Sequence, residues 1–212
     1  TCPQGDRFLI LSWLSCFLLI DFAGTRRMTR FEGSAGSGKT TASKITSTLL
    51  YGEPQHKKAT DAANYTDGSQ NPLIVLDNIE VKQMTEDLTT FMLTSITGIA
   101  KEKRKSGTDS ETITERTKCL LNTTGIEPLC GELSEILSRS FVINFDLANQ
   151  ASDCFLESEV ISAIQQNRDL IISAIMKRTS HVLAMIRDGA QKQVMRLLHR
   201  TMPTHGKRRC ND

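Results

Sequence analysis

Residues 31–45 read FEGSAGSGKTTASKI, and the eight residues at 33–40, GSAGSGKT, match the pattern G-x-x-x-x-G-K-[ST]. This pattern is typical of a loop that wraps backbone N–H groups around a chain of phosphates. Its glycines permit left-handed turns and a close approach of the backbone to the phosphates. A helix that begins near the last of them adds the partial positive charge of its amino end. The predicted phosphate site comprises Gly33, Ser34, Ala35, Gly36, Ser37, Gly38, Lys39 and Thr40.

The side chains at the end of this loop, and an acid further along, indicate ATP and Mg²⁺ as cofactors. Lys39 would reach the β- and γ-phosphates, and the hydroxyl of Thr40 would bind Mg²⁺. The apolar run LIVL at 73–76 is typical of a buried parallel strand, and Asp77 follows at its carboxyl end. A carboxylate at that edge would hold Mg²⁺, usually through water. The alternative is that Asp77 only caps the next loop.

The residue after Asp77 bears on hydrolysis. Many ATPases of this layout place a glutamate there, which orients and deprotonates the attacking water, whereas this chain has Asn78. An amide can orient a water but cannot take its proton. Glu80 lies near in sequence but past the predicted strand end. We therefore expect slow hydrolysis or a base elsewhere.

Two more polar residues are candidates for catalysis. Asn122 ends the run CLLN, which predicts a strand next to the phosphate loop, so its amide is a candidate contact for the γ-phosphate or the attacking water. An asparagine that begins the turn NTTG fits the spacing equally well. Arg139 lies between a short helix and a predicted strand at 140–145. A lone arginine is more often an exposed surface residue.

Most of the chain alternates strand and helix patterns, which predicts an α/β fold with a parallel sheet and a C-terminal helical lid. Residues 26–33 are assigned as the first strand from their position, because they are more polar than a central parallel strand normally is. Residues 59–72 are rich in Asn, Asp, Ser and Gly and predict irregular structure. Apolar spacing from 84 to 96 predicts a helix that ends at Gly98. Residues 100–118 predict a hairpin.

The expected organisation is a leading apolar helix packed on the core at 1–25, a P-loop ATPase core at 26–148, a helical lid at 149–200 and a disordered tail at 201–212. The lid is predicted as two helical stretches, of which the second begins near 180. The apolar run at 8–20 is shorter than the about 20 residues that cross a bilayer, so we interpret it as a buried helix. We expect no membrane span and a cytoplasmic location. The chain begins at Thr1 rather than Met, so we expect a fragment or a processed piece.

Overall charge does not favour a polyanionic partner, since the net charge is +2 and the isoelectric point is about 8.2. Any nucleic-acid site must therefore come from local clustering. One basic cluster lies in the predicted hairpin and consists of Lys101, Lys103, Arg104 and Lys105. The alternative is that these cations keep an exposed strand edge from aggregating. Six scattered cysteines lack the spacing of a zinc site or a disulfide framework.

In chain order, the loop GSAGSGKT, the strand LIVLDN, the asparagine in CLLNTTGIEP and the arginine in LSRSFVINF resemble the motifs of AAA+ ATPases. They are most similar to those of the superfamily 3-like, primase-associated helicase ATPases of phages and mobile elements. The leading helix LSWLSCFLL is similar as well. The resemblance covers roughly residues 8–146.

The resemblance implies a three-layer, AAA+-like P-loop NTPase fold and a homo-oligomeric ring, with a hexamer as one expectation. It implies that Asn122 senses the γ-phosphate, that Arg139 is an arginine finger for a neighbouring subunit, and that the hairpin tracks DNA. An asparagine at position 78 also occurs in this subgroup. The chain departs from the family in its polar first strand, in lacking a primase-like N-terminal region, and in having no clear second sensor.

Together these observations predict an Mg²⁺-dependent ATPase that forms a ring and moves or remodels DNA, with a primase or another replication protein as a partner. The alternative is an ATP-binding switch with little turnover. Asn78 favours the switch, whereas Arg139 and the basic hairpin favour the motor. A small-molecule kinase is less consistent with the sequence, because no basic lid for an acceptor is evident.

Overall fold

The structure is a computed structural model that describes residues 4–22, 24–55, 61–104, 112–129, 133–146 and 156–187. The α-helices are α1 (Gln4–Cys16), α2 (Lys39–Tyr51), α3 (Asp61–Gln70), α4 (Glu86–Thr97), α5 (Ser134–Ser138) and α6 (Glu157–Arg187). The short 3₁₀ helices are η1 (Phe17–Leu19) and η2 (Val81–Gln83). The strands are β1 (Met28–Gly33), β2 (Leu73–Leu76), β3 (Lys101–Arg104), β4 (Thr112–Glu115), β5 (Leu120–Gly125) and β6 (Ser140–Phe145).

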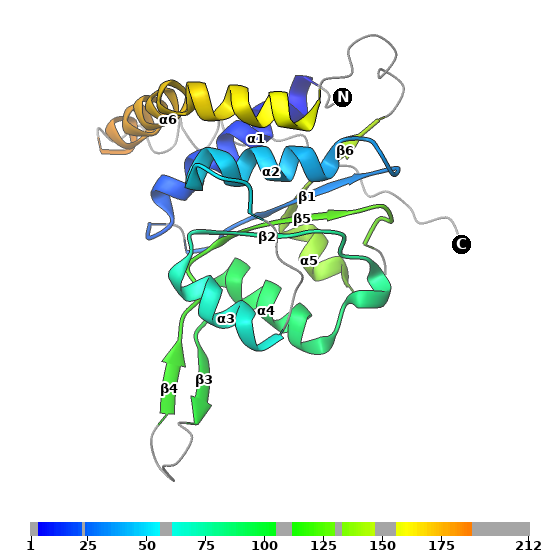
Figure 1. Cartoon of the computed structure of the whole chain (residues 1–212). Coiled ribbons are helices and arrows are strands. Elements are labelled where there is room, and N and C mark those ends of the chain that lie inside the picture. Colours follow the sequence, from blue (N-terminus) through cyan, green and yellow to red (C-terminus); the bar gives the residue numbers. More distant parts are fainter. Residues whose placement is uncertain are drawn as a thin grey trace.

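Four strands form a parallel sheet in the order β2-β5-β1-β6, as Figure 1 shows. The chain therefore passes over β5 on its way from β1 to β2. Because all four strands are parallel, they end at one edge of the sheet, which we call the carboxyl edge, and begin at the opposite amino edge. The sheet confirms the predicted α/β fold, and its order places the phosphate-loop strand next to β5.

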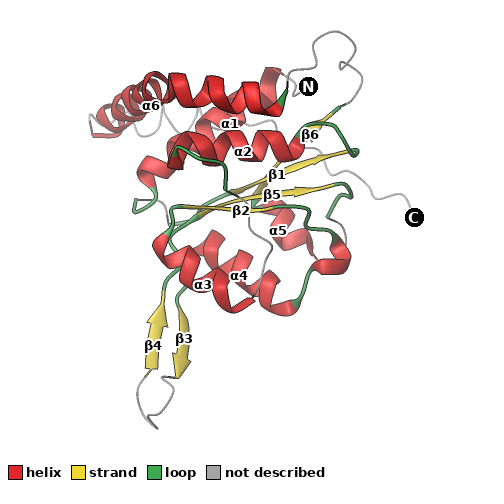
Figure 2. Cartoon of the chain, viewed as in Figure 1, coloured by secondary structure: helices red, strands yellow, loops and turns green. Residues whose placement is uncertain are grey.

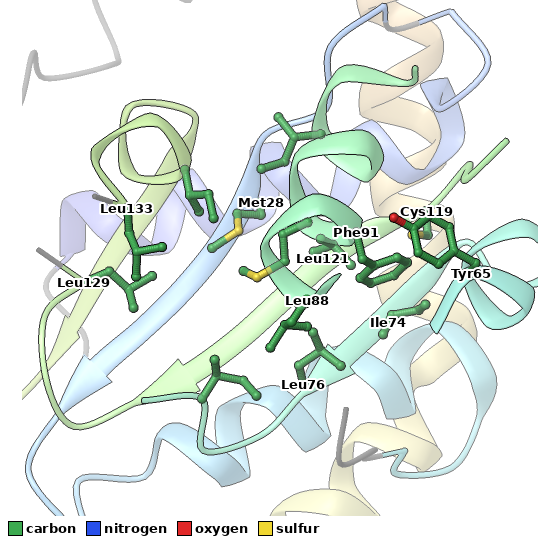
Figure 3. Packing of buried hydrophobic residues seen from close by; sticks show 14 residues of the cluster. Met28, Tyr65, Ile74, Leu76, Leu88, Phe91, Cys119, Leu121, Leu129 and Leu133 are labelled. Carbon is green, nitrogen blue, oxygen red and sulfur yellow. The ribbon is translucent and has the colours of Figure 1, made fainter. Parts of the chain in front are cut away.

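Helices cover both faces of the sheet and give the predicted three layers (Figures 1 and 2). On one face α2 packs against the strands, and α1 and α6 lie beyond it. On the other face α3, α4 and α5 cover a continuous apolar core. Figure 3 shows Met28, Leu76, Phe91 and Leu121 packed together in that core. Burial of these side chains is the main driving force that holds the helices to the sheet.

The polar first strand is confirmed, and its polar side chains lie inside the protein. Thr29 and Arg30 are 0% exposed and Glu32 is 4% exposed. The Arg30 Nε donates to Glu32 Oε1 at 2.9 Å. Buried polar groups are tolerated when they have hydrogen-bond partners, as in β1. The expectation that a central parallel strand is apolar does not take such partners into account.

The prediction of irregular structure at 59–72 was wrong for residues 61–70, which form α3. Tertiary packing explains the helix. The Tyr65 ring contacts the Phe91 ring edge-on, with centroids 5.2 Å apart. Gly68 fits closely against α4, because a Cβ there would lie 3.1 Å from a ring carbon of Phe91. A close helix–helix contact therefore overrides the weak helix propensity of the segment.

The C-terminal region also differs from its prediction. A single helix, α6, runs from Glu157 to Arg187 without a break near 180. The Thr179 hydroxyl lies close to the expected break and donates to the Ile175 carbonyl within the helix, at 2.9 Å. The rest of the predicted lid and the predicted tail lie outside the described residues. The part of the lid that is described packs along α2 and α1.

The remaining predicted elements are present. The leading apolar segment forms α1 and η1, with Trp13 and Leu14 buried. Strands β3 and β4 pair antiparallel, with Lys101 opposite Glu115 and Arg104 opposite Thr112, so the hairpin is confirmed. Its turn, 105–111, lies outside the described residues. Within the described ranges, the helices are too short or too polar to cross a bilayer.

Candidate nucleotide site

The loop at 33–40 connects β1 to α2 at the carboxyl edge of the sheet. Gly36 and Gly38 have φ angles of 77° and 92°, in the left-handed region that glycine adopts without strain. Gly33 is needed for a different reason: a Cβ there would lie 2.2 Å from the Phe145 carbonyl oxygen at the end of β6. Ser34, Ala35 and the two left-handed glycines are exposed, whereas Ser37 is buried. The loop therefore presents backbone to solvent directly above the start of α2.

Lys39 lies at the first position of α2 and is 8% exposed. Its Nζ donates to the carbonyls of Gly33 and Ser34, both at 2.7 Å, and to Ser37 Oγ at 3.4 Å. Burial lowers the pKa of Lys39 below its ordinary value, while the carboxylates of Glu80 and Asp77 act in the opposite direction. The ammonium group thus lies across the loop that would surround a phosphate chain.

Thr40 and Asp77 meet beside this loop, although they come from different elements. The Thr40 hydroxyl donates to Asp77 Oδ1 at 3.1 Å. The same oxygen accepts a hydrogen bond from Thr124 Oγ1 at 2.6 Å. Hydroxyl and carboxylate oxygens are the hard ligands that Mg²⁺ prefers, and Mg²⁺ commonly takes only one or two carboxylates together with phosphate oxygens and water. The donor set at this point therefore fits Mg²⁺.

Asn78 has a φ of 55° and is the non-glycine residue with positive φ in the described part of the chain. Left-handed backbone costs most residues about 1–2 kcal/mol and is tolerated best by Gly, Asn and Asp. The Asn78 N–H donates to Thr124 Oγ1 at 2.8 Å, which holds this conformation in place. The backbone thus gives a physical reason for asparagine at the position where many ATPases of this layout have a glutamate, and its side chain is exposed at the carboxyl edge.

Glu80, the nearby carboxylate, is engaged in holding backbone. Its two oxygens accept hydrogen bonds from the N–H groups of Ile126 and Glu127, at 2.7 Å and 3.1 Å. It also forms a capping box with Gln83 at the start of η2. These bonds tie the loop after β2 to the loop after β5.

The structure corrects the expected position of Asn122. Strand β5 continues to Gly125, so Asn122 is the third of its six residues and does not lie at the strand end. Its side chain is 0% exposed, accepts from Ser43 Oγ at 2.5 Å and donates to Thr29 Oγ1 at 2.9 Å. Asn122 thus links α2, β5 and β1 below the site, with its amide already satisfied.

Thr124 is a residue of the candidate site that the sequence pattern did not indicate. It lies at the carboxyl edge, where its hydroxyl contacts both Asp77 and the backbone of Asn78. The run of two threonines before Gly125 could have indicated it, because β-branched residues favour strands and would extend β5 to that edge.

Arg139 lies at the amino edge, far from the phosphate loop of its own chain. The next residue, Ser140, is opposite Met28 at the start of β1, whereas the loop begins at the end of that strand. Six strand residues separate the two edges by roughly 20 Å, at about 3.3 Å per residue. Arg139 pairs with Glu135 on α5 at 2.9 Å, and its side chain is 35% exposed. It is therefore too far away to reach the phosphate loop of its own chain.

Three of the predicted nucleic-acid residues, Lys101, Lys103 and Arg104, lie on strand β3 of the hairpin. Lys105 falls outside the described residues. The hairpin extends from the amino edge, on the side opposite the phosphate loop (Figure 1). The structure thus separates the predicted nucleotide and nucleic-acid sites.

No protein-family model matches the chain, and no curated protein matches it either. Solved structures do. The apo C-terminal region of NrS-1 is 17% identical, with a TM-score of 0.53 over 82% of this chain and 41% of that one. The active helicase SCCmec type IV Cch is 16% identical, with a TM-score of 0.51 over 85% of this chain and 37% of that one.

These likenesses show that the chain shares the fold of these proteins. The chain spans about two fifths of the length of each solved chain.

Proposed function

We propose that this chain is an ATP-binding, Mg²⁺-dependent ATPase domain of a helicase-like motor. The observation that supports this most is the contact of Thr40 with Asp77 beside a glycine loop that carries Lys39. Thr40 and Asp77 lie 37 positions apart in sequence and come together only through the fold. A glycine-rich turn that matched the phosphate-loop pattern by chance would not be expected to place a carboxylate on its threonine.

In this proposal each residue acts on the nucleotide through a group that the structure already places at the carboxyl edge. The exposed backbone of the loop binds phosphate oxygens, and Lys39 turns from the loop carbonyls toward the β- and γ-phosphates. Thr40 and Asp77 would hold Mg²⁺, which would supply positive charge beside the phosphates. Thr124 fixes the orientation of Asp77.

The exposed amide of Asn78 would orient the attacking water. Because it cannot accept a proton, hydrolysis by one subunit alone would be slow. We propose that Arg139 of a neighbouring copy completes the site, which requires a ring or another head-to-tail oligomer. The position of Arg139 away from its own loop supports this arrangement, since a head-to-tail contact joins two different surfaces of adjacent subunits.

We further propose that the hairpin binds nucleic acid and that the chain acts in DNA replication or in a mobile element, in the cytoplasm, with a primase or another replication protein. The basic residues of β3 support the first part, and the name of a solved protein of the same fold, an active helicase, supports a motor that acts on nucleic acid. The second candidate is an ATP-binding switch with little turnover, which Asn78 favours because it is not a base.

DNA-stimulated ATP hydrolysis distinguishes the two. The motor predicts turnover that rises when single- or double-stranded DNA is added, and that Asp77→Ala abolishes while ATP binding persists. The switch predicts ATP binding with a low turnover that DNA leaves unchanged. A low, DNA-insensitive rate in the oligomeric protein would reject the motor proposal.

A further inference from the structure

The side chain of Arg30 makes three hydrogen bonds inside the protein, where it is fully buried. Its Nε donates to Glu32 Oε1 at 2.9 Å, its Nη1 to the Ile79 carbonyl at 3.1 Å and its Nη2 to the Glu127 carbonyl at 2.8 Å. One guanidinium therefore joins β1 to two loops of the carboxyl edge. This fork of fixed donors is specific to arginine.

The bond to Ile79 spans a strand. Ile79 follows β2, which is not a neighbour of β1, because β5 lies between them. The guanidinium crosses β5 at Gly125, where a Cβ would lie 2.1 Å from Arg30 Nη2 and 2.8 Å from the Ile79 carbonyl oxygen. Gly125 does not have a left-handed backbone, so its lack of a side chain serves space rather than conformation.

The loops that Arg30 joins are those of the proposed nucleotide site. Ile79 lies two residues after Asp77, and its N–H donates to the Thr124 carbonyl at 2.8 Å. Glu127 lies in the loop that the Glu80 carboxylate also holds. Glu32, the ionic partner of Arg30, immediately precedes the phosphate loop. The phosphate loop, the loop after β2 and the loop after β5 thus share one buried ion pair.

We propose that the Arg30–Glu32 pair is a positioning device that holds the loop after β2 at a set distance from the phosphate loop, and so fixes Asp77 against Thr40. This inference rests on the proposed nucleotide function. A buried ion pair gives little net stability compared with apolar side chains of similar size, because desolvation of the charges offsets their attraction. In this proposal the Arg30–Glu32 pair therefore serves to place Asp77 rather than to stabilise the fold.

Gly125→Ala tests this without removing either charge. The added methyl group would lie 2.1 Å from Arg30 Nη2, which donates to the Glu127 carbonyl, and 2.8 Å from the Ile79 carbonyl oxygen, so the guanidinium must shift away from both carbonyls, while the backbone at this position accepts alanine. Thr123→Val is the matched control, because Thr123 lies on the same strand two residues away and its buried hydroxyl has no hydrogen-bond partner among the described residues. Calorimetric titrations with ADP in the absence of Mg²⁺, and with ATP with and without Mg²⁺, provide the readout.

In Gly125→Ala, ADP should bind without Mg²⁺ as in the wild type, because the phosphate loop is intact. The gain in ATP affinity that Mg²⁺ provides should fall roughly 10-fold to 100-fold, the scale found when groups that orient metal ligands are removed. A crystal structure of the variant should show Thr40 Oγ1 and Asp77 Oδ1 farther apart than 3.1 Å. Thr123→Val should change neither quantity.

Arg30→Lys is a second variant, since it keeps a positive charge beside Glu32 but lacks the fork that reaches both carbonyls. It should show the same selective loss of the Mg²⁺ effect. A Gly125→Ala or Arg30→Lys protein that is less stable to heat but keeps the wild-type Mg²⁺ effect would overturn the inference and leave the proposed function intact. A wild-type protein that binds no nucleotide would overturn both.

Discussion

The two edges of the sheet are built in different ways. At the carboxyl edge, polar side chains are buried or half-buried and bonded to one another, as with Thr40, Asp77 and Thr124. At the amino edge, Arg26 is half-buried and donates to backbone carbonyls, but Arg139 and Lys118 form ion pairs at the surface. Arg139 bonds a carboxylate that is itself 57% exposed, and Lys118 bonds Asp21 with both side chains more than half exposed.

This difference indicates different tasks. Groups held by several short bonds are preorganised and have little freedom to lose when a ligand binds. Exposed ion pairs contribute about 0–1 kcal/mol and exchange partners easily, so they suit an interface that forms with another molecule. This difference is consistent with the proposal that the nucleotide binds at the carboxyl edge, and that a neighbouring subunit and nucleic acid bind at the amino edge. Three predictions test this proposal.

The largest effect is expected for Arg139→Ala. If Arg139 acts on the nucleotide of a neighbouring copy, its loss should lower ATP hydrolysis by a factor on the order of 10³–10⁵. Mixing inactive Arg139→Ala with inactive Lys39→Ala should restore part of the rate, because some interfaces then combine an intact loop with an intact arginine. Glu135→Ala is the control and should hydrolyse normally, since it only frees Arg139 from a surface pair. Full specific activity of a monomer at every concentration would contradict the proposal that the amino edge completes a neighbouring subunit's site.

The next effect concerns the support beneath the carboxyl edge. Asn122→Ala should lower the free energy of unfolding by about 2–4 kcal/mol, because the buried hydroxyls of Ser43 and Thr29 lose their shared partner. Thr123→Val on the same strand should cost little or nothing, since it removes a hydroxyl that has no partner in the described part of the chain. Urea unfolding gives both values. An Asn122→Ala protein with wild-type stability and no hydrolysis would instead support the sensor role that the sequence suggested.

The smallest effect concerns the hairpin. Replacing Lys103 and Lys105 by alanine should weaken DNA binding to a similar degree for all sequences, because phosphates carry no base information. The slope of log K against log salt should fall by roughly 1.4 for single strands, at about 0.7 per lost phosphate contact. ATP affinity should stay unchanged, since the loop is at the other edge. Fluorescence anisotropy at several salt concentrations measures the slope. An unchanged slope would favour the alternative that these cations keep an exposed strand edge from aggregating.

Much of the fold could be predicted because its signals are local. The uninterrupted apolar run LIVL is typical of a buried strand, and the apolar spacing before Gly98 is typical of a helix. Both elements are present. By contrast, α3 depends on contacts with α4, and such contacts cannot be inferred from the polar composition of residues 59–72.

The candidate site divides in the same way. The phosphate loop is contiguous, so its geometry follows from its own residues. The residue at the edge depends on where β5 ends, and the prediction ended the strand at Asn122, three residues early, so it placed Asn122 rather than Thr124 near the edge. The Arg30–Ile79 contact crosses a strand, so it requires the sheet order, which alternation of helices and strands does not specify.

The central claim is that the carboxyl edge binds ATP through the phosphate loop. Isothermal titration of Mg²⁺–ATP into the wild type, Lys39→Ala and Lys44→Ala tests it most directly. Lys44 is the matched control, because it lies on the same helix but pairs with Glu157 of α6 instead of crossing the loop.

We expect the wild type and Lys44→Ala to bind with similar affinity. Lys39→Ala should bind roughly 10-fold to 100-fold more weakly, the scale of a lost hydrogen bond to a charged group. Equal affinity of Lys39→Ala and the wild type, or no binding by the wild type, would contradict the account.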